Sequence, residues 1–259
     1  MKKRSFAVVA LLLTAVLLFA SCSGVSVLEY KNGTYVNNDT GIAYRHAPIN
    51  YESQNVNKSK TVAQSGKDDL EGNYLYAIEG ADTNQYLTSI HNDLFYADGI
   101  TLPTLAQMNP GQILFTRTKV LTASLLQIND PEIISDVVSA YGGIGIDEDL
   151  IIYEDDTLKY NFRLKFASDA YPMFYYTLDF FGYNKELTVW EPIDDPNQFE
   201  IVYPGVEVTV ATEGEYTYAV YHFGTDFLYD RATETFYPLG DALESYHTKL
   251  DDSLIGMGS

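Results

Sequence analysis

The stretch Leu158–Phe166, with the sequence LKYNFRLKF, gives the clearest indication of fold class in this chain of 259 residues. Apolar and polar side chains alternate along it, and successive side chains of a β-strand point to opposite faces. The apolar members of the alternation are Tyr160, Phe162, Leu164 and Phe166. We therefore expect a strand that buries these side chains and turns the residues between them toward water.

Similar segments precede and follow this strand at short, regular intervals, which is typical of an antiparallel sheet. The polar segment 50–68 instead predicts a surface loop. Residues 26–46 predict a meander of three strands, whose first turn is Asn32-Gly33 because both residues accept a positive φ. Further strands are expected at residues 73–79, 85–90, 94–96, 112–117, 173–181, 186–190, 199–203, 206–211, 216–223, 227–229 and 235–237.

The strongest helix signal covers residues 131–141. Asp130 can cap this helix, Pro131 suits its first position and the pair Gly142-Gly143 ends it. Because the glycines follow a helix and do not precede one, they do not indicate a phosphate-binding loop.

A second helix is expected at residues 240–250, where Asp241 and Glu244 have the spacing of a capping box. Residues 103–108 predict one helical turn, and residues 120–127 are a further helix candidate. The fold class expected from these patterns is α+β, built mainly of antiparallel sheet with a few helices.

A domain boundary is expected at Asn109-Pro110-Gly111, since this cluster of turn residues interrupts the strand pattern. It would separate an N-terminal β-rich lobe, residues 28–111, from a C-terminal α+β lobe, residues 112–259. A single continuous domain fits the sequence nearly as well.

The N-terminal segment has the features of an export signal. Lys2, Lys3 and Arg4 precede an apolar run from Phe6 to Ala20, which is short for a membrane-spanning helix. The run ends in Ala20-Ser21-Cys22, and small residues before a cysteine resemble the lipobox of bacterial lipoproteins. The resemblance covers Met1 to Cys22 only.

The lipoprotein resemblance implies that residues 1–21 are a signal peptide and that Cys22 becomes an acylated N-terminus, carrying for example palmitate. Residues 22–27 would then form the lipidated cysteine and a short tether, and the protein would be held on the extracytoplasmic side of a cell membrane. The alternative is an ordinary signal peptide cut after Ala20 or Ser21. Cys22 is the only cysteine, so it has no disulfide partner within the chain.

The chain is strongly acidic, with 36 Asp and Glu against 16 Lys and Arg. Loss of Lys2, Lys3 and Arg4 with the leader would change its formal charge from −20 to −23. A charge of this sign repels nucleic acids and anionic lipids, so neither is expected as a partner.

No stretch of the sequence carries a catalytic or cofactor-binding motif, and we expect no cofactor. The four histidines show no metal-binding spacing, although His91 and Asp93 could share a strand face. Among the acidic clusters, residues 147–156 are the best calcium candidate, through Asp147, Asp149 and Asp155. A solvated loop is the simpler interpretation of that cluster.

Aromatic side chains are the feature that best supports binding. The chain has 22 Tyr and 13 Phe but one Trp, and exposed aromatic rings can hold sugars or protein partners. Trp190, Tyr175 and Tyr183 are the candidate ligand-binding residues; otherwise they belong to the core of the sheet. The sequence thus favours a lipid-anchored, non-catalytic protein that binds a glycan or a protein. The alternatives are an exported hydrolase of glycans or peptides and a structural component of the envelope.

Overall fold

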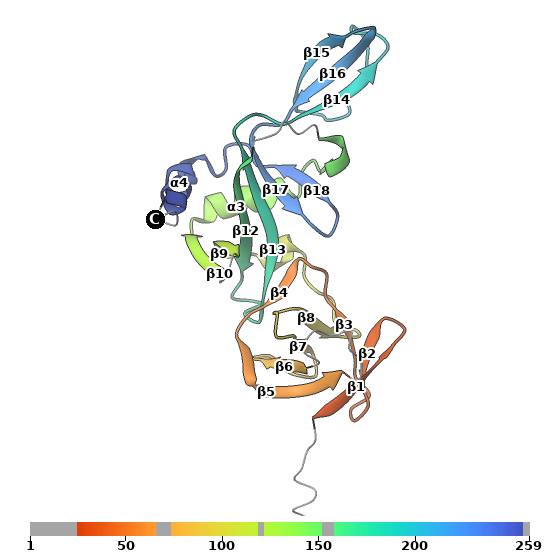
Figure 1. Cartoon of the computed structure of the whole chain (residues 1–259), viewed down its shortest axis with the longest axis vertical. Helices are drawn as coiled ribbons and strands as arrows, with labels where there is room; N and C mark the ends of the chain where they lie inside the picture. The colour runs from red at the N-terminus through yellow and green to blue at the C-terminus, as the bar shows by residue number, and fades with distance from the viewer. Residues whose placement is uncertain (1–24, 66–73, 119–121, 152–157, 256–259) are drawn as a thin grey trace, which may run out of the picture. The chain divides into compact units, whose positions relative to one another are not determined.

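The computed structural model of the chain describes residues 25–65, 74–118, 122–151 and 158–255 (Figure 1). Strands account for 49% of the structure and helices for 13%, which confirms a β-rich fold. The strands form three separate sheets, one of which is a closed barrel. The predicted α+β class, with mainly antiparallel sheet, therefore describes this architecture only in part. The predicted signal peptide and Cys22 lie outside the described residues.

The chain divides into two compact units. One contains the residues up to His46 together with Asn55–Ile100, and the other contains Ala47–Gln54 together with the residues from Thr101 onward. The change from the first unit to the second falls after Ile100, earlier than the boundary expected at Asn109-Pro110-Gly111.

The first unit is a closed barrel of strands (Figure 1). A parallel pairing of β1 with β5, from Ser26↔Ala63 to Leu28↔Ser65, completes the ring. Its interior is filled by buried side chains that include Leu28, Tyr44 and Phe95. Around the ring the strands are β1 (Ser26–Lys31), β2 (Thr34–Asn37), β3 (Ala43–His46), β8 (Leu94–Ala97), β7 (Tyr86–Thr88), β6 (Tyr74–Ile78) and β5 (Val56–Ser65).

The predicted meander is confirmed as β1, β2 and β3. Asn32 has φ +50° and Gly33 has φ +82°, so the turn between β1 and β2 has the two left-handed residues that a tight hairpin needs. The surface loop predicted for residues 50–68 is wrong, because β4 (Tyr51–Ser53) and β5 lie within it. These polar strands are held by backbone pairing to β13 (Phe174–Tyr183), β1 and β6, a long-range interaction that local composition does not reveal.

The second unit is built on a large antiparallel sheet (Figure 1). The strand predicted at Leu158–Phe166 lies in this sheet as β12. Its alternating residues Tyr160, Phe162, Leu164 and Phe166 are all buried. Strand β4 (Tyr51–Ser53) also pairs with β13, in addition to the strands whose order is given next. The strand order is β10 (Thr122–Ile128), β9 (Gln112–Thr118), β12 (Leu158–Ala167), β13 (Phe174–Tyr183), β17 (Asp226–Asp230), β18 (Thr235–Pro238) and β11 (Ile146–Asp147).

The helix predicted at residues 131–141 is confirmed as α3 (Pro131–Tyr141). The Asp130 side chain accepts a hydrogen bond from Glu132 N at 3.0 Å, as an N-cap residue does. The single helical turn expected at 103–108 is α2 (Leu105–Met108), which Thr104 and Gln107 close with a capping box. The helix predicted at 120–127 is wrong, because this segment pairs with β9 as strand β10.

The second predicted helix begins later than expected. Residues 240–243 form turns, followed by the 3₁₀ helix η2 (Glu244–Tyr246) and then α4 (His247–Ile255). Gly240 has φ +53°, which excludes it from a right-handed helix, and η2 has no side-chain cap. The expected capping box of Asp241 and Glu244 therefore does not form.

The second unit also contains a small third sheet, in the order β14 (Thr188–Ile193), β16 (Tyr216–His222) and β15 (Glu207–Glu213) (Figure 1). The strand predicted at 199–203 is wrong, because Pro204 and Gly205 (φ +86°) make a turn there and Val202 N donates to Tyr221 Oη. No helix among the described residues has the length and apolar character required to cross a membrane.

Candidate functional site

The two faces of the three-stranded sheet have different surroundings. Val189, Ala219 and Tyr221 share one face and are buried in a core cluster. Tyr203 covers that face, with its ring 5.0 Å from the Tyr221 ring in an edge-to-face arrangement. This inner face is covered around Val189, Ala219 and Tyr221, whereas Val210 at its β15 side is exposed. We call the opposite face of β14, β16 and β15 the outer face.

The outer face is aromatic along its middle. Trp190 on β14 lies opposite Val220 on β16, and the Trp190 and Tyr218 rings are 5.5 Å apart. Trp190 Nε1 donates to Thr188 Oγ1 at 3.1 Å, which fixes the orientation of the indole. Tyr216, at the far end of β16, is 67% exposed. The Trp190 and Tyr218 rings are tilted by 59° to each other, and together with Tyr216 they offer aromatic surface of the kind that packs against sugars, peptides or cations.

Polar groups border the aromatic rings. His222 Nδ1 is 3.0 Å from Glu186 Oε2, and its Nε2 is 2.9 Å from Thr209 Oγ1, so both ring nitrogens are engaged. Glu207 and Glu213 are exposed on β15 and pair in register with His222 and Tyr216. The outer face therefore combines aromatic rings on β14 and β16 with carboxylates along β15.

The structure separates the three aromatic residues that the sequence singled out. Trp190 lies on the outer face. Tyr183 is buried in the core cluster, so it is not accessible to a ligand. Tyr175 lies in another sheet, on β13, where Lys165 Nζ is 5.4 Å from its ring centre and burial raises the pKa of its hydroxyl.

Tyr216 and Tyr218 are the residues of the outer face that sequence reasoning missed. Their segment was predicted as a strand, and their period of two places them on one face. The missing information was the register of β16 against β14, which sets Trp190 beside Tyr218 and cannot be read from either segment alone.

The calcium candidates are only partly described. Asp147 Oδ1 accepts a hydrogen bond from Asp149 N at 3.0 Å and thereby caps the 3₁₀ helix η1 (Glu148–Leu150). Asp155 lies outside the described residues. Within the described ranges, no group of three or more His, Cys, Asp or Glu side chains converges as metal ligands would.

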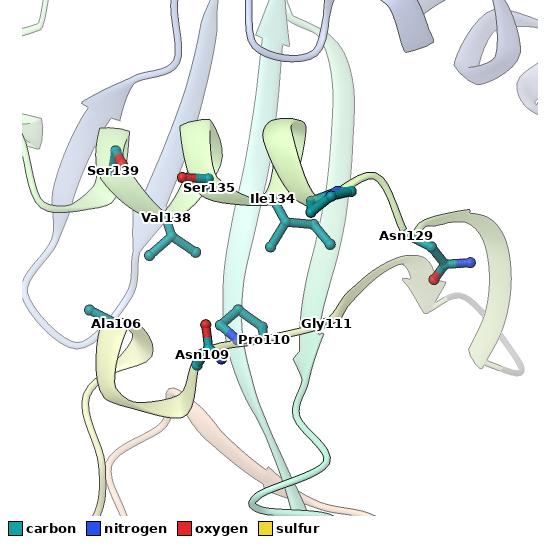
Figure 2. Close-up of a pocket in the computed structure, with 10 residues that line it drawn as sticks. Ala106, Asn109, Pro110, Gly111, Asn129, Ile134, Ser135, Val138 and Ser139 are labelled. Carbon is teal, nitrogen blue, oxygen red and sulfur yellow. The ribbon is translucent and has the colours of Figure 1, made fainter.

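A cavity of about 230 Å³ lies between α3 and the segment that follows α2 (Figure 2). Figure 2 shows the Ile134 and Val138 side chains directed from α3 toward Ala106 and Pro110. The lining residues include Asn109, Asn129, Ser135 and Ser139, but no acid and no histidine. The cavity thus offers neither the paired carboxylates of a glycosidase nor an acid–histidine pair.

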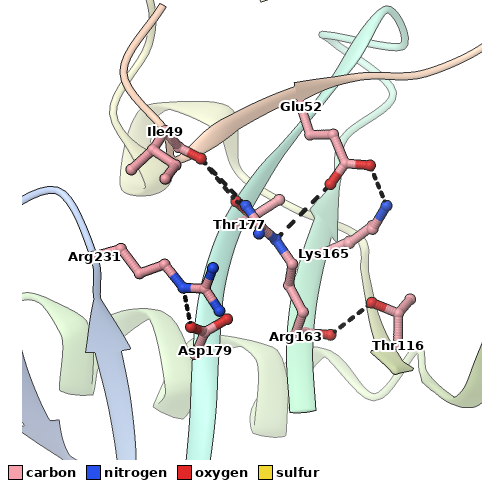
Figure 3. A network of polar contacts seen from close by, with 8 residues as sticks. All are labelled: Ile49, Glu52, Thr116, Arg163, Lys165, Thr177, Asp179 and Arg231. Atoms are coloured by element: carbon pink, nitrogen blue, oxygen red, sulfur yellow. Dashed lines mark hydrogen bonds and ion pairs between the residues drawn. The ribbon is translucent and has the colours of Figure 1, made fainter. Parts of the chain in front are cut away.

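A polar network crosses one face of the large sheet (Figure 3). Lys165 pairs with Glu52, Arg231 pairs with the buried Asp179, and Arg163 Nη2 donates to Thr177 Oγ1 at 2.9 Å. These cations neutralise carboxylates of neighbouring strands and of the segment that carries Glu52. The network therefore joins elements of the unit. Within the described residues, Arg163 Nε is a buried atom without a hydrogen bond and lies 3.9 Å from Glu52 Oε2.

Two histidine clusters remain. Near His91, the Ser89 hydroxyl donates to Asp93 Oδ2 at 2.7 Å and accepts from His91 N, so the residues form a local turn. His247 Nε2 is 2.5 Å from Asp226 Oδ2, which ties α4 to β17. Burial raises the pKa of Asp226, although the contact with His247 opposes the shift. Neither cluster places a histidine beside a nucleophile in a cavity.

No protein-family model matches the chain, and neither the curated proteins nor the solved structures include a significant match to it. The geometry of the outer face is therefore the basis for assigning a function.

Proposed function

We propose that this protein is a membrane-anchored extracytoplasmic lipoprotein whose role is to bind another molecule, a glycan or a protein, without catalysis. Cys22 carries the lipid, and the outer face of the small sheet carries the binding site. The proposal for the anchor is supported by the lipobox-like residues Ala20-Ser21-Cys22.

The observation that carries the binding role is the position of the half-buried Trp190 and Tyr218 and the exposed Tyr216 on the face opposite the core cluster. Aromatic rings that remain on the surface have an unfavourable hydration free energy and do not add to the core. At an interface, however, they contribute large contact areas. The hydrolase alternative has less support, because the cavity beside α3 has no ionisable lining residue.

The test is Trp190→Ala in binding screens against glycan arrays and peptide arrays. We expect a ligand of the wild-type protein to bind the variant at least about tenfold more weakly, because Trp and Tyr side chains carry much of the energy of such interfaces. The melting temperature should change little, since Trp190 is only partly buried.

Tyr74→Ala is the matched control, because Tyr74 is an exposed aromatic side chain of the barrel unit. It should leave binding unchanged. Equal binding by wild type and Trp190→Ala, with the fold intact, would remove the outer face as the binding site.

A further inference from the structure

We propose that the outer face, together with the free edge of β15, binds an extended, positively charged segment of a partner protein. The inference rests on the proposed binding role and names the chemical class of its ligand. Three observations carry it: the local charge, the aromatic rings and the unpaired strand edge.

The formal charges of the segment that forms the small sheet are all negative. No Lys or Arg occurs between Lys185 and Arg231. The segment 186–223, which forms the three-stranded sheet and its connections, contains eight carboxylates: Glu186, Glu191, Asp194, Asp195, Glu200, Glu207, Glu213 and Glu215. Such a surface attracts cationic segments over a distance of about a Debye length and repels acidic glycans.

The aromatic rings suit the same ligand class. Lys and Arg side chains bind the faces of Trp and Tyr rings, and Trp is the strongest partner. Elsewhere in the chain, Lys159, Lys165 and Lys249 lie over tyrosine rings at 4.6, 5.4 and 4.4 Å. The segment that carries Trp190 and Tyr218 has no lysine or arginine of its own, so it leaves these rings available to a cation from a partner.

The β15 side of the outer face complements the rings. Thr209 and Ala211 are small and lie between Glu207 and Glu213 on the same face. A lysine side chain that crosses Ala211 toward the Tyr218 ring therefore has a carboxylate on either side of it along β15. This arrangement favours a cation over a neutral sugar, because a cation is attracted by the full charge of the carboxylates whereas a neutral sugar gains only hydrogen bonds to them.

The edge of β15 supplies a way to hold an extended chain. Over Glu207–Glu213, β15 pairs with β16 on one side only, and no described strand pairs with its other side. The opposite edge of the sheet, β14, contains Pro192, which has no backbone N–H to donate. A peptide added to β15 would run for roughly 20 Å and place every second side chain over the outer face. Basic residues at alternate positions would fit both the edge and the carboxylates.

The experiment uses Trp190 as its own reporter, because it is the only tryptophan in the chain. The purified protein from Ser23 onward, with the barrel unit included, is titrated with a capped peptide of about eight alternating Lys and Thr residues. We expect the Trp190 fluorescence to change on binding. The dissociation constant should rise about tenfold or more between roughly 50 and 500 mM salt. A Glu–Thr peptide of equal length and neutral oligosaccharides should leave the fluorescence unchanged.

Two comparisons test the parts of the inference. Glu207→Gln with Glu213→Gln should weaken binding of the Lys–Thr peptide about tenfold. Asp136→Asn with Asp169→Asn removes two exposed acids from elsewhere in the same unit and should not weaken it. An N-substituted glycine oligomer with the same aminobutyl groups has no backbone N–H, and it should bind about tenfold more weakly than the peptide if strand addition contributes.

The outcomes separate this inference from the proposed function. A fluorescence change with neutral oligosaccharides, but none with the Lys–Thr peptide, would overturn the cationic ligand while retaining a binding face. Equal binding of the peptide and the N-substituted oligomer would overturn strand addition at β15. If Trp190 responds to none of these probes, and Trp190→Ala also changes no interaction on the arrays, the proposed function fails as well.

Discussion

At the scale of single residues, the ion pair of Asp179 and Arg231 shows how one side chain makes the burial of another possible. Asp179 is buried, whereas Arg231 is half-exposed. Asp179 is 2% exposed on β13, in the middle of the large sheet. Burial raises the pKa of its carboxyl group, and the Arg231 guanidinium opposes that shift. The ionised carboxylate is therefore tolerated in the sheet because Arg231 accompanies it.

Arg231→Gln should consequently destabilise the second unit in a pH-dependent way. At about pH 7.5 we expect a loss of roughly 2 kcal/mol, less than for a fully buried pair because the Arg231 side chain is 48% exposed. The loss should be smaller near pH 4, where Asp179 can take up a proton. Urea unfolding followed through Trp190 fluorescence at both pH values measures the difference.

The direction of this pH dependence follows from the raised pKa. Between the unfolded value, 3.8, and the higher folded value, the folded protein binds a proton at Asp179 that the unfolded chain has released. The contribution of Asp179 to the free energy of unfolding is therefore fully present below the unfolded pKa. It is lost as the pH rises through the folded pKa. Removing Arg231 raises the folded pKa further and enlarges that loss.

Lys249→Gln is the control for the loss of one positive charge, since Lys249 is exposed on α4. It should change stability by less than about 0.5 kcal/mol at either pH. A destabilisation by Arg231→Gln that is the same at both pH values would show that Arg231 does not change the titration of Asp179 in the folded protein.

Individual residues could be predicted from the sequence only where their neighbours in the chain define their role. Asp130 is such a residue, because the helix that it caps follows at once. Trp190 and Tyr183 were both candidate ligand-binding residues, since both belong to the same aromatic-rich stretch of the sequence. Their fates differ because Tyr183 faces a core built by β16, β17 and β18, which come later in the chain. No local pattern encodes that assembly.

At the scale of secondary-structure elements, β12 and β13 depend on one close approach. Tyr160 pairs with Gly182 across the two strands, and the Tyr160 ring lies over the glycine. A Cβ atom at position 182 would be 2.3 Å from Tyr160 Cδ2. The ring cannot move freely, because it is 2% exposed and stacks on Phe162 and Phe180.

Gly182→Ala should therefore destabilise the second unit by roughly 1–3 kcal/mol, the usual range for overpacking a core. Gly111→Ala is the matched control, because a Cβ there meets no atom within 4 Å and the backbone is not left-handed. It should change the free energy of unfolding by less than about 0.5 kcal/mol. Urea titrations of both variants measure the difference, and equal stability would contradict the packing argument.

Elements were predictable where local signals and long-range pairing agree. The α3 helix has a cap, a proline at its first position and terminal glycines, and it forms as expected. The polar strand β5 has no such local support, since it exists because its backbone closes the barrel between β1 and β6. Residues 122–128 have a composition that a helix also accepts, and pairing with β9 determines their state.

At the scale of the whole molecule, charge and attachment have to be considered together. A formal charge of −20, or −23 without the leader, keeps the protein away from anionic lipid headgroups. This charge does not favour a position at an anionic membrane, so the proposed attachment depends on the lipid that we propose for Cys22. The same charge suits the proposed capture of a cationic partner by the outer face.

Cys22→Ala should release the protein from membranes into the soluble extracytoplasmic fraction. The substitution breaks no disulfide, because the chain has no other cysteine. One acyl chain binds a bilayer only weakly and several bind stably, so loss of the acylated residue should abolish sedimentation with membranes, not merely reduce it. Thermal unfolding and Trp190 fluorescence of the released variant should match those of the protein from Ser23 onward. Wild-type protein should have an intact mass greater than that of the unmodified chain by its acyl groups, and a mass equal to that of a free thiol would exclude the anchor.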